Sequence, residues 1–191
     1  MTEAGTPLRI APLRPADRSR VEAIVRATGV FREAEIAIAL EVVDSFFIHP
    51  DRDYSALGAF TPDGDLIGYV CYGPTPGTAR TWDVYWIAVD PAAQCNGVGT
   101  MLLQEAERRL ARSDARLVII ETSSQPLYDP TRAFYARRGY HEVARVPDFY
   151  ADGDDRVIFA KRLQSSSTGS PTHGNLARDP APEPHDGRRV D

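Results

Sequence analysis

Hydrophobic residues recur at helical spacing in three stretches of the chain, residues 17–29, 33–47 and 98–112. Asp17 is expected to cap the first of these helices, and Gly29 is expected to end it. A short fourth helix is expected to begin with Asp129 as its cap and to end at Gly139. The positions predicted to face the core from the three longer helices are Val21, Ile24 and Val25; Ile36, Leu40, Val43 and Phe47; and Val98, Met101, Leu102, Ala106 and Leu110.

Apolar-rich runs outside these helices predict a set of strands. A Pro62-Asp63-Gly64 turn separates two of the runs, which favours a hairpin, and a turn at 152–155 separates the last two. The order of strands and helices predicts a mixed α+β sheet with one parallel crossover. The predicted strands are residues 8–13, 54–60, 66–72, 81–89, 117–122, 141–146 and 156–163.

The composition of the chain changes abruptly near its end. Residues 164–191 contain a run of three serines and four prolines but only four apolar residues. Such a segment cannot bury enough surface to offset the entropy lost on ordering it. We therefore expect one folded domain over residues 1–163, followed by a disordered tail rich in serine and proline over residues 164–191.

Charge and cysteine content exclude several classes of partner. The net charge is −5, and the 22 basic residues, all arginine except Lys161, are interleaved with acids. Without a basic stripe, neither nucleic acid nor an anionic membrane is an expected partner. The chain contains no run of about 18 apolar residues, so a transmembrane helix is not expected. Residues 1–7 lack the pattern of a secretory signal. Cys71 and Cys95 are expected to be free thiols in a reducing, cytoplasmic compartment, and no spacing of ligand residues indicates a metal site.

Candidate chemistry lies where the strand 81–89 runs through a loop into the helix 98–112. Gly97 and Gly99 stand at the start of that helix, where backbone N–H groups are unpaired and the helix dipole is positive. Glycine lets the main chain approach a bulky anion closely, so the expected ligand is a phosphate or pyrophosphate. The nucleotide P-loop is excluded because no lysine follows Gly99, and the dinucleotide fingerprint is excluded because Leu102 stands where it needs glycine.

The spacing Gln94-x-x-Gly97-x-Gly99 resembles the pyrophosphate loop of the GNAT superfamily of acetyl-CoA-dependent N-acetyltransferases. The segment 133–140, a short helix that ends in Gly139-Tyr140, resembles the second motif of that superfamily. The order of the predicted elements also matches, so the resemblance covers residues 8–163. It implies the GNAT fold, with a central, mostly antiparallel sheet flanked by helices. It also implies acetyl-CoA as co-substrate without a metal, and a primary amine on a small molecule or a peptide as acceptor. Both a monomer and a homodimer stay open.

The resemblance also implies roles for particular residues. Acetyl-CoA would lie in a cleft between the strands 81–89 and 117–122. The strand main chain would hold the acetyl carbonyl and the pantetheine, and the loop N–H groups would hold the pyrophosphate. The residues concerned are Ile87, Ala88 and Val89 on the strand, and Gln94, Cys95, Asn96, Gly97, Val98, Gly99 and Thr100 in the loop. Tyr128 stands where many members carry an asparagine that contacts pantetheine or substrate; Ser123, Ser124 or Thr131 could supply that contact instead.

Three side chains are candidates for proton transfer. Tyr135 is expected to protonate the departing thiolate of CoA. Asp83 and, as a second candidate, Glu121 could deprotonate the amine; the opposing interpretation of Asp83 is an exposed acid at the start of a strand. Strict alternation along the strand would place Asp83 on the same face as Tyr85, Ile87 and Val89.

The sequence thus predicts an N-acetyltransferase in which the amine attacks acetyl-CoA directly in a ternary complex. The alternative is a non-catalytic domain that binds acyl-CoA and regulates a partner. The acids Glu33, Glu35, Glu41 and Asp44 on the second helix could attract a cationic amine or could form an ordinary solvated face.

Overall fold

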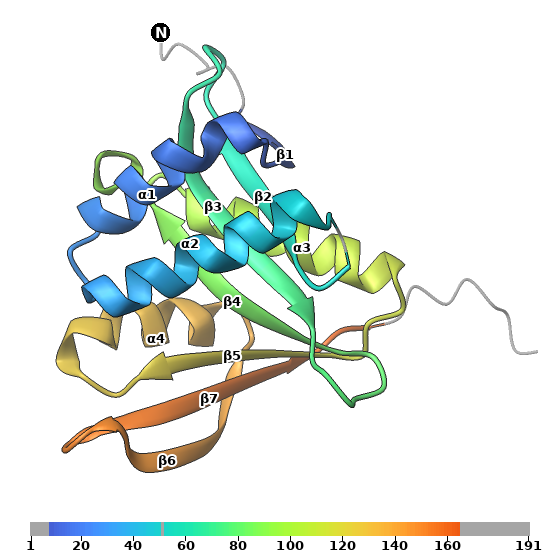
Figure 1. The fold of residues 1–191 in the computed structure, drawn as a ribbon. Helices are drawn as coiled ribbons and strands as arrows, with labels where there is room; N and C mark the ends of the chain where they lie inside the picture. Colours follow the sequence, from blue (N-terminus) through green and yellow to red (C-terminus); the bar gives the residue numbers. More distant parts are fainter. Residues whose placement is uncertain (1–7, 51, 165–191) are drawn as a thin grey trace, which may run out of the picture.

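The structure of the chain is a computed structural model that describes residues 8–50 and 52–164 (Figure 1). The predicted tail therefore lies outside the described residues, apart from Gln164. The strands are β1 (Arg9–Pro12), β2 (Ser55–Phe60), β3 (Leu66–Pro74), β4 (Thr81–Val89), β5 (Leu117–Ser123), β6 (His141–Ala151) and β7 (Asp154–Arg162). The helices are α1 (Arg18–Ala27), α2 (Glu33–Ile48), α3 (Val98–Arg112) and α4 (Asp129–Arg137), with short 3-10 turns η1 (Pro15–Asp17), η2 (Pro91–Ala93) and η3 (Pro126–Tyr128). In these residues, no helix has the length and apolar character needed to cross a membrane.

The strands form one seven-stranded sheet in the order β1-β2-β3-β4-β5-β7-β6. Only the pair β4 and β5, which α3 connects, is parallel, and the other five neighbouring pairs are antiparallel. This confirms the predicted mixed sheet with one parallel crossover.

Each face of the sheet is covered by a different pair of helices (Figure 1). Apolar residues of α1 and α2, such as Val25 and Val43, pack in one core with Tyr69 and Cys71 of β3. Residues of α3 and Tyr135 of α4 pack in a second core on the opposite face. Burial of these two apolar layers is the main force that holds the helices against the sheet.

Of the two predicted helix caps, the position of Asp17 is confirmed and that of Asp129 is wrong. Asp17 does stand at the start of α1, but its carboxylate accepts hydrogen bonds from Arg14, at 2.8 Å from the backbone nitrogen, and not from the helix. Asp129 is the first helical residue of α4 and not its cap, and its carboxylate binds Arg132. In both cases a nearby guanidinium binds the carboxylate that was expected to bind the helix N–H groups.

Two predicted core positions are also wrong. Phe46 of α2 and Leu103 of α3 are buried, whereas the expected Phe47 and Met101 lie half-buried at the edges of their helices. Phe47 directly follows Phe46, and Met101 lies two positions before Leu103. A helix turns about 100° per residue, and the sequence pattern does not fix the centre of the apolar stripe. The β6–β7 turn is shorter than predicted. It consists of Asp152 and Gly153, and Gly153 has a φ of +75°. β6 therefore extends to Ala151.

Gly73 of β3 is required by close packing. A Cβ atom at this position would lie 2.3 Å from the backbone carbonyl oxygen of Asp53, which cannot move as a side chain can. At Gly99, by contrast, the nearest atom would lie 3.6 Å away, on the Phe134 ring.

We therefore predict opposite effects of the same substitution at the two glycines. Gly73→Ala should lower the free energy of unfolding by about 1–3 kcal/mol, since overpacking displaces backbone. Gly99→Ala should leave it unchanged or raise it by up to about 1 kcal/mol, because alanine favours the helix. Urea denaturation of the ligand-free protein measures both, and equal stabilities of the two variants would contradict the packing argument.

Candidate active site

The hydrogen-bonded ladder between β4 and β5 covers only the first part of each strand. Its last registered pair is Val84 with Ile120, although β4 continues to Val89 and β5 to Ser123. The two strands diverge beyond that point (Figure 1). Ligands of open sheets bind outside the carboxyl ends of parallel strands, so the opening here is the first candidate site.

A bulge in β4 lies at the start of the opening. Cys71 of β3 pairs with Trp86 while the next residue, Tyr72, pairs with Val84, so Tyr85 has no partner on β3. The bulge reverses the faces of the strand: Val84 lies in the core below α3, whereas Trp86 packs toward α1 and α2, with its ring 5.7 Å from that of Phe31.

The prediction of one shared face for Asp83, Tyr85, Ile87 and Val89 is therefore wrong. Ile87 and Val89 pack on the α3 side, and Ala88 is buried on the α1 and α2 side. Asp83 stands between two residues that pack toward α3, so its side chain points to the other face. Burial and the nearby carboxylate of Asp83 raise the pKa of Tyr85 to about 12.

The loop after β4 presents a row of free backbone donors. Gly97, with φ of +78°, begins α3, and Cys95 also has a positive φ of 64°. Among the described residues, no group accepts a hydrogen bond from the N–H groups of residues 95–100; the first paired one is that of Met101, 3.0 Å from the Gly97 carbonyl oxygen. The Gln94 side chain folds back and donates to the Val89 carbonyl oxygen at 3.2 Å. The arrangement suits a pyrophosphate, which needs several converging donors.

Tyr135 of α4 lies in the core on the α3 side, with 5% of its surface exposed. Its ring centre lies 6.0 Å from that of Phe159 and 6.1 Å from that of Tyr140. Within the described chain its hydroxyl forms no hydrogen bond, and burial raises the pKa of Tyr135 well above its usual value. The phenol therefore stays protonated at neutral pH and can donate a proton.

The two candidate bases lie on the same face, next to the end of the ladder. Asp83 is one residue before the last pair on β4, and Glu121 is one residue after it on β5. The Asp83 carboxylate accepts a hydrogen bond from the Thr75 hydroxyl at 2.7 Å. The carboxylate of Glu121 is paired with Arg156 of β7. Asp83 has no cationic partner among the described residues, so its carboxylate is more available than that of Glu121 to accept a proton.

The acids expected to attract a cationic amine are mostly ion-paired. Three of them bind an arginine: Glu33 with Arg26 at 2.7 Å, Glu35 with Arg32 at 3.1 Å and Asp44 with Arg18 at 2.7 Å. Exposed pairs of this kind contribute little to stability, about 0–1 kcal/mol each. They do, however, neutralise most of the negative charge of α2.

Tyr128 takes a structural role that the sequence did not indicate. Its hydroxyl donates to the Val30 carbonyl oxygen at 3.1 Å, which fastens the loop between α1 and α2 to the segment before α4. Burial, together with the charge of Glu35, raises the pKa of Tyr128 to about 12.

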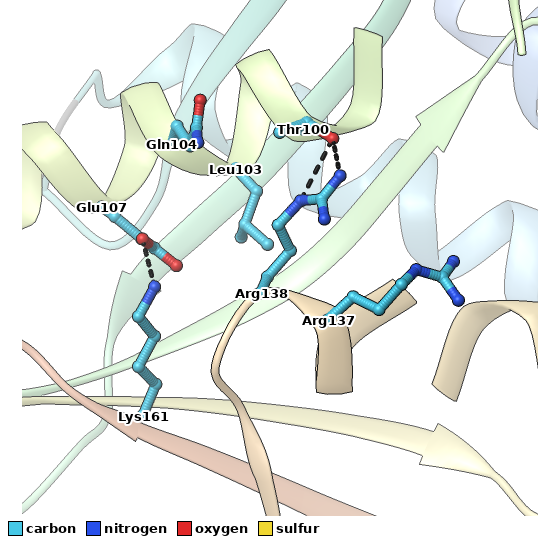
Figure 2. A pocket seen from close by; sticks show the side chains of 7 residues that line it. All are labelled: Thr100, Leu103, Gln104, Glu107, Arg137, Arg138 and Lys161. Atoms are coloured by element: carbon cyan, nitrogen blue, oxygen red, sulfur yellow. Dashed lines mark hydrogen bonds and ion pairs between the residues drawn. The ribbon is translucent and has the colours of Figure 1, made fainter. Parts of the chain in front are cut away.

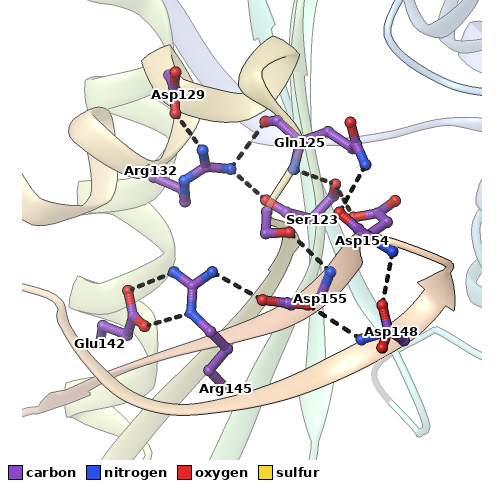
Figure 3. A network of polar contacts seen from close by, with 11 residues as sticks. Ser123, Gln125, Asp129, Arg132, Glu142, Arg145, Asp148, Asp154 and Asp155 are labelled. Carbon is purple, nitrogen blue, oxygen red and sulfur yellow. Dashed lines mark hydrogen bonds and ion pairs between the residues drawn. The ribbon is translucent and has the colours of Figure 1, made fainter.

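A polar network fixes the β6–β7 hairpin to the end of β5 (Figure 3). The Ser123 hydroxyl donates to Asp154, the Gln125 side chain donates to the Gly153 carbonyl oxygen at 3.1 Å, and Arg132 donates to the carbonyl oxygens of Ser123 and Gln125. The hairpin carries Tyr150, which is half-buried; burial and the charges of Asp154 and Glu35 raise its pKa. No local motif marks these residues, because they come together only through the sheet.

A pocket of about 320 Å³ lies between α3, α4 and β7 (Figure 2). Arg138 donates to the Thr100 hydroxyl, with its Nε at 3.2 Å, and its guanidinium lies 5.1 Å from the centre of the Phe134 ring. Lys161 is paired with Glu107 at 2.7 Å. The remaining lining residues are Leu103, Gln104 and Arg137. Arg137 and Arg138 stand within the motif of the short helix, but the sequence alone indicates no role for them.

Coenzyme A fits the chemistry of these residues, since a row of free N–H groups and nearby arginines suits its phosphates. Over the described ranges, no three His, Cys, Asp or Glu side chains are grouped to hold a metal ion.

Comparison with known proteins agrees with this arrangement. The model of the acetyltransferase (GNAT) family matches residues 28–140. A crystal structure of a GNAT-family protein from Desulfovibrio desulfuricans superposes with a TM-score of 0.79 at 38% identity, and covers 83% of this chain and 100% of its own. The PaiA N-acetyltransferase of Thermoplasma acidophilum, in complex with coenzyme A, has the same fold with a TM-score of 0.63 at 20% identity, over 82% of this chain and 99% of its own.

The S-(2-succino)cysteine N-acetyltransferase of Bacillus subtilis is 26% identical over 136 residues, which is 69% of this chain and 82% of the relative. The match of the family model, which includes the free-donor loop, the end of the β4–β5 ladder and Tyr135, confirms the resemblance found in the sequence: this chain belongs to the GNAT family of N-acetyltransferases.

Proposed function

We propose that this chain transfers the acetyl group of acetyl-CoA to a primary amine, which attacks the thioester directly in a ternary complex. The observation that carries the proposal is the row of free N–H groups over residues 95–100, placed beside the open end of the β4–β5 ladder. A thioester held by its pyrophosphate at this loop would reach into the opening. The coenzyme A found in the Thermoplasma relative supports the same donor.

In this proposal the loop residues Gln94, Cys95, Asn96, Gly97, Val98, Gly99 and Thr100 hold the pyrophosphate through their main chain. Gln94 contributes only its main chain, because its side chain is bound to Val89. The main chain of Ile87, Ala88 and Val89 lines the strand edge that β5 leaves unpaired. An N–H donor aimed there at the acetyl carbonyl would stabilise the developing oxyanion by about 3–4 kcal/mol.

Tyr135 supplies the proton for the departing CoA thiolate. Its ring is fixed by aromatic neighbours, so the hydroxyl has one direction, and its raised pKa keeps it in the donor form. A correctly positioned general acid increases the reaction rate by about 10²–10⁴-fold.

Asp83 removes the proton from the attacking ammonium, directly or through a water molecule. The β4 bulge supports this role, because it directs Asp83 to the face of the sheet opposite the pyrophosphate loop and α3. The acceptor would then enter from the side of α1 and α2, near Trp86 and Tyr150. Glu121 is the second candidate and is less free because of Arg156.

The acceptor is a primary amine on a small molecule or a peptide. The Bacillus relative acts on an amino-acid derivative, which favours a small molecule. Two free thiols, Cys71 and Cys95, and an acyl-CoA donor are in keeping with a cytoplasmic enzyme. The alternative of a non-catalytic acyl-CoA-binding domain has no specific observation in its favour.

Acetyl-CoA is expected to stabilise the protein against heat. At one hundred times its dissociation constant, a ligand of the folded state adds about 2.7 kcal/mol, which is a shift of several degrees in melting temperature. Thermal unfolding with acetyl-CoA, CoA and ATP measures this, followed by a screen of amines for release of free CoA thiol. Protection by ATP alone, or by none of the three, would contradict the proposal.

Tyr135→Phe should lower kcat by about 10²-fold with little change in KM for acetyl-CoA, because only the proton donor is lost. Tyr140→Phe is the matched control: that hydroxyl is buried beside the carboxylate of Glu107 on α3, so its removal should leave kcat unchanged. Steady-state kinetics from pH 7 to 9 compare the three proteins. If both variants keep the activity of the parent, Tyr135 is not the acid.

Asp83→Asn should lower kcat by at least about tenfold at pH 7 and should recover part of that loss at high pH, where more of the free amine is unprotonated. Glu121→Gln should have the smaller effect, since Arg156 already neutralises that carboxylate. The pH dependence of kcat/KM for the two variants distinguishes them. A greater loss in Glu121→Gln would reverse the assignment.

A further inference from the structure

Two carboxylates lie at the end of the β4–β5 ladder, and their surroundings differ. Glu121 is paired with the guanidinium of Arg156, which neutralises its charge. Asp83 instead accepts a hydrogen bond from the hydroxyl of Thr75 at 2.7 Å, and no cation is paired with it in the described part of the chain. A hydroxyl donor can fix the direction of a carboxylate and leave its negative charge in place, whereas a cation cannot.

Thr75 is itself held firmly in the turn between β3 and β4. Its N–H donates to the Thr81 carbonyl oxygen at 2.9 Å. Its own carbonyl oxygen accepts hydrogen bonds from the Thr78 hydroxyl at 2.8 Å and from the Thr78 N–H at 3.3 Å. Because these hydrogen bonds fix the main chain of Thr75, its hydroxyl is presented to Asp83 from a rigid support.

The sheet leaves room for this contact. Asp83 is opposite Gly73 in the β3–β4 register, so no side chain stands across from the carboxylate. The Tyr85 ring fills part of the free space: a Cβ atom at position 73 would lie 3.2 Å from its edge, and its centre lies 5.2 Å from that of Tyr54. Asp83 therefore has two neighbours that carry a hydroxyl, Thr75 and Tyr85, and Thr75 binds its Oδ2 atom.

The direction of the Asp83 carboxylate decides whether it can act on the amine. Asp83 lies one residue before the last ladder pair, next to the opening. A base must lie within hydrogen-bond reach of the proton that it removes, and an aspartate that changes its rotamer carries its carboxylate elsewhere. With Oδ2 bound to Thr75 the rotamer is fixed, and the carboxylate still has lone pairs that can accept the ammonium proton.

We propose that Thr75 is a positioning residue for the general base: its hydroxyl holds the Asp83 carboxylate toward the acceptor amine without neutralising it. The ammonium proton passes to that carboxylate. The amine nitrogen then forms its bond with the acetyl carbon, and the bond from that carbon to the CoA sulfur breaks. This inference rests on the proposed function and adds to it a residue that acts only through Asp83.

Thr75→Val removes the hydroxyl and keeps the shape of the side chain. The assay uses acetyl-CoA and the amine that gives the highest kcat/KM in the screen described above. Thr75→Val should lower kcat by about fivefold to tenfold and leave KM for acetyl-CoA within about twofold, because only the direction of the base is lost. Thr75→Ser retains the hydroxyl and should recover most of the loss. A Thr75→Val enzyme as fast as the parent, or a Thr75→Ser enzyme as slow as Thr75→Val, would overturn the inference.

Thr61→Val is the matched control. Thr61 also follows a strand directly and has its hydroxyl in a hydrogen bond, which it accepts from the Asp65 N–H at 3.1 Å in the turn between β2 and β3. This variant therefore loses the same group from a similar turn without any contact with Asp83. It should keep the kcat of the parent, and a loss as large as that of Thr75→Val would show a general effect of such substitutions and overturn the inference.

A double-mutant cycle with Asp83→Asn shows whether Thr75 acts through Asp83. If it does, Thr75→Val should lower kcat of the Asp83→Asn enzyme by less than about twofold, since no base is left to position. The same loss in both backgrounds would overturn the inference while the proposed function stands. Full activity of Asp83→Asn would refute the assigned base, and the inference with it, whereas failure to acetylate any amine would refute the proposed function itself.

Discussion

The hydrogen-bonded ladder between β4 and β5 ends at Val84 and Ile120, and the arrangement of the site depends on that ending. Beyond it, β4 remains paired with β3 on one edge and leaves its other edge open. An unpaired strand edge in the middle of a sheet is costly unless something supplies donors and acceptors. The fold keeps this edge open between two helix layers, where a ligand chain can take the place of the missing strand.

The bulge at Tyr85 gives the opening its two sides. By exchanging the faces of β4 it places Ile87 and Val89 over the α3 core and Asp83 toward α1 and α2. The donor loop and the carboxylate therefore lie on opposite sides of one sheet. Two substrates that approach from opposite faces can meet without competing for the same space.

Much of this fold can be predicted from the sequence where local pattern and tertiary packing agree. The bounds of β4 and α3 match the prediction to the residue, because an apolar strand, a Gly97-x-Gly99 turn and an amphipathic helix follow one another directly. The face of the sheet to which Asp83 points could not be predicted. The bulge arises from the pairing of β4 with β3, and the hydrophobic pattern of β4 itself does not reveal it. Likewise, the contact of Arg138 with Thr100 and that of Tyr128 with Val30 join residues 38 and 98 positions apart, which no local motif records.

Lys161 is the only lysine in the chain, and it is held in a half-buried ion pair with Glu107. Every other basic side chain is an arginine, whose guanidinium stays protonated and does not act as a nucleophile toward thioesters. A surface of this composition exposes almost no side-chain amine to the activated acetyl group that the enzyme handles. The side chains of this protein are consequently poor acceptors of the acetyl group, both in a reaction that the enzyme catalyses and in non-enzymatic lysine acetylation by the same thioester.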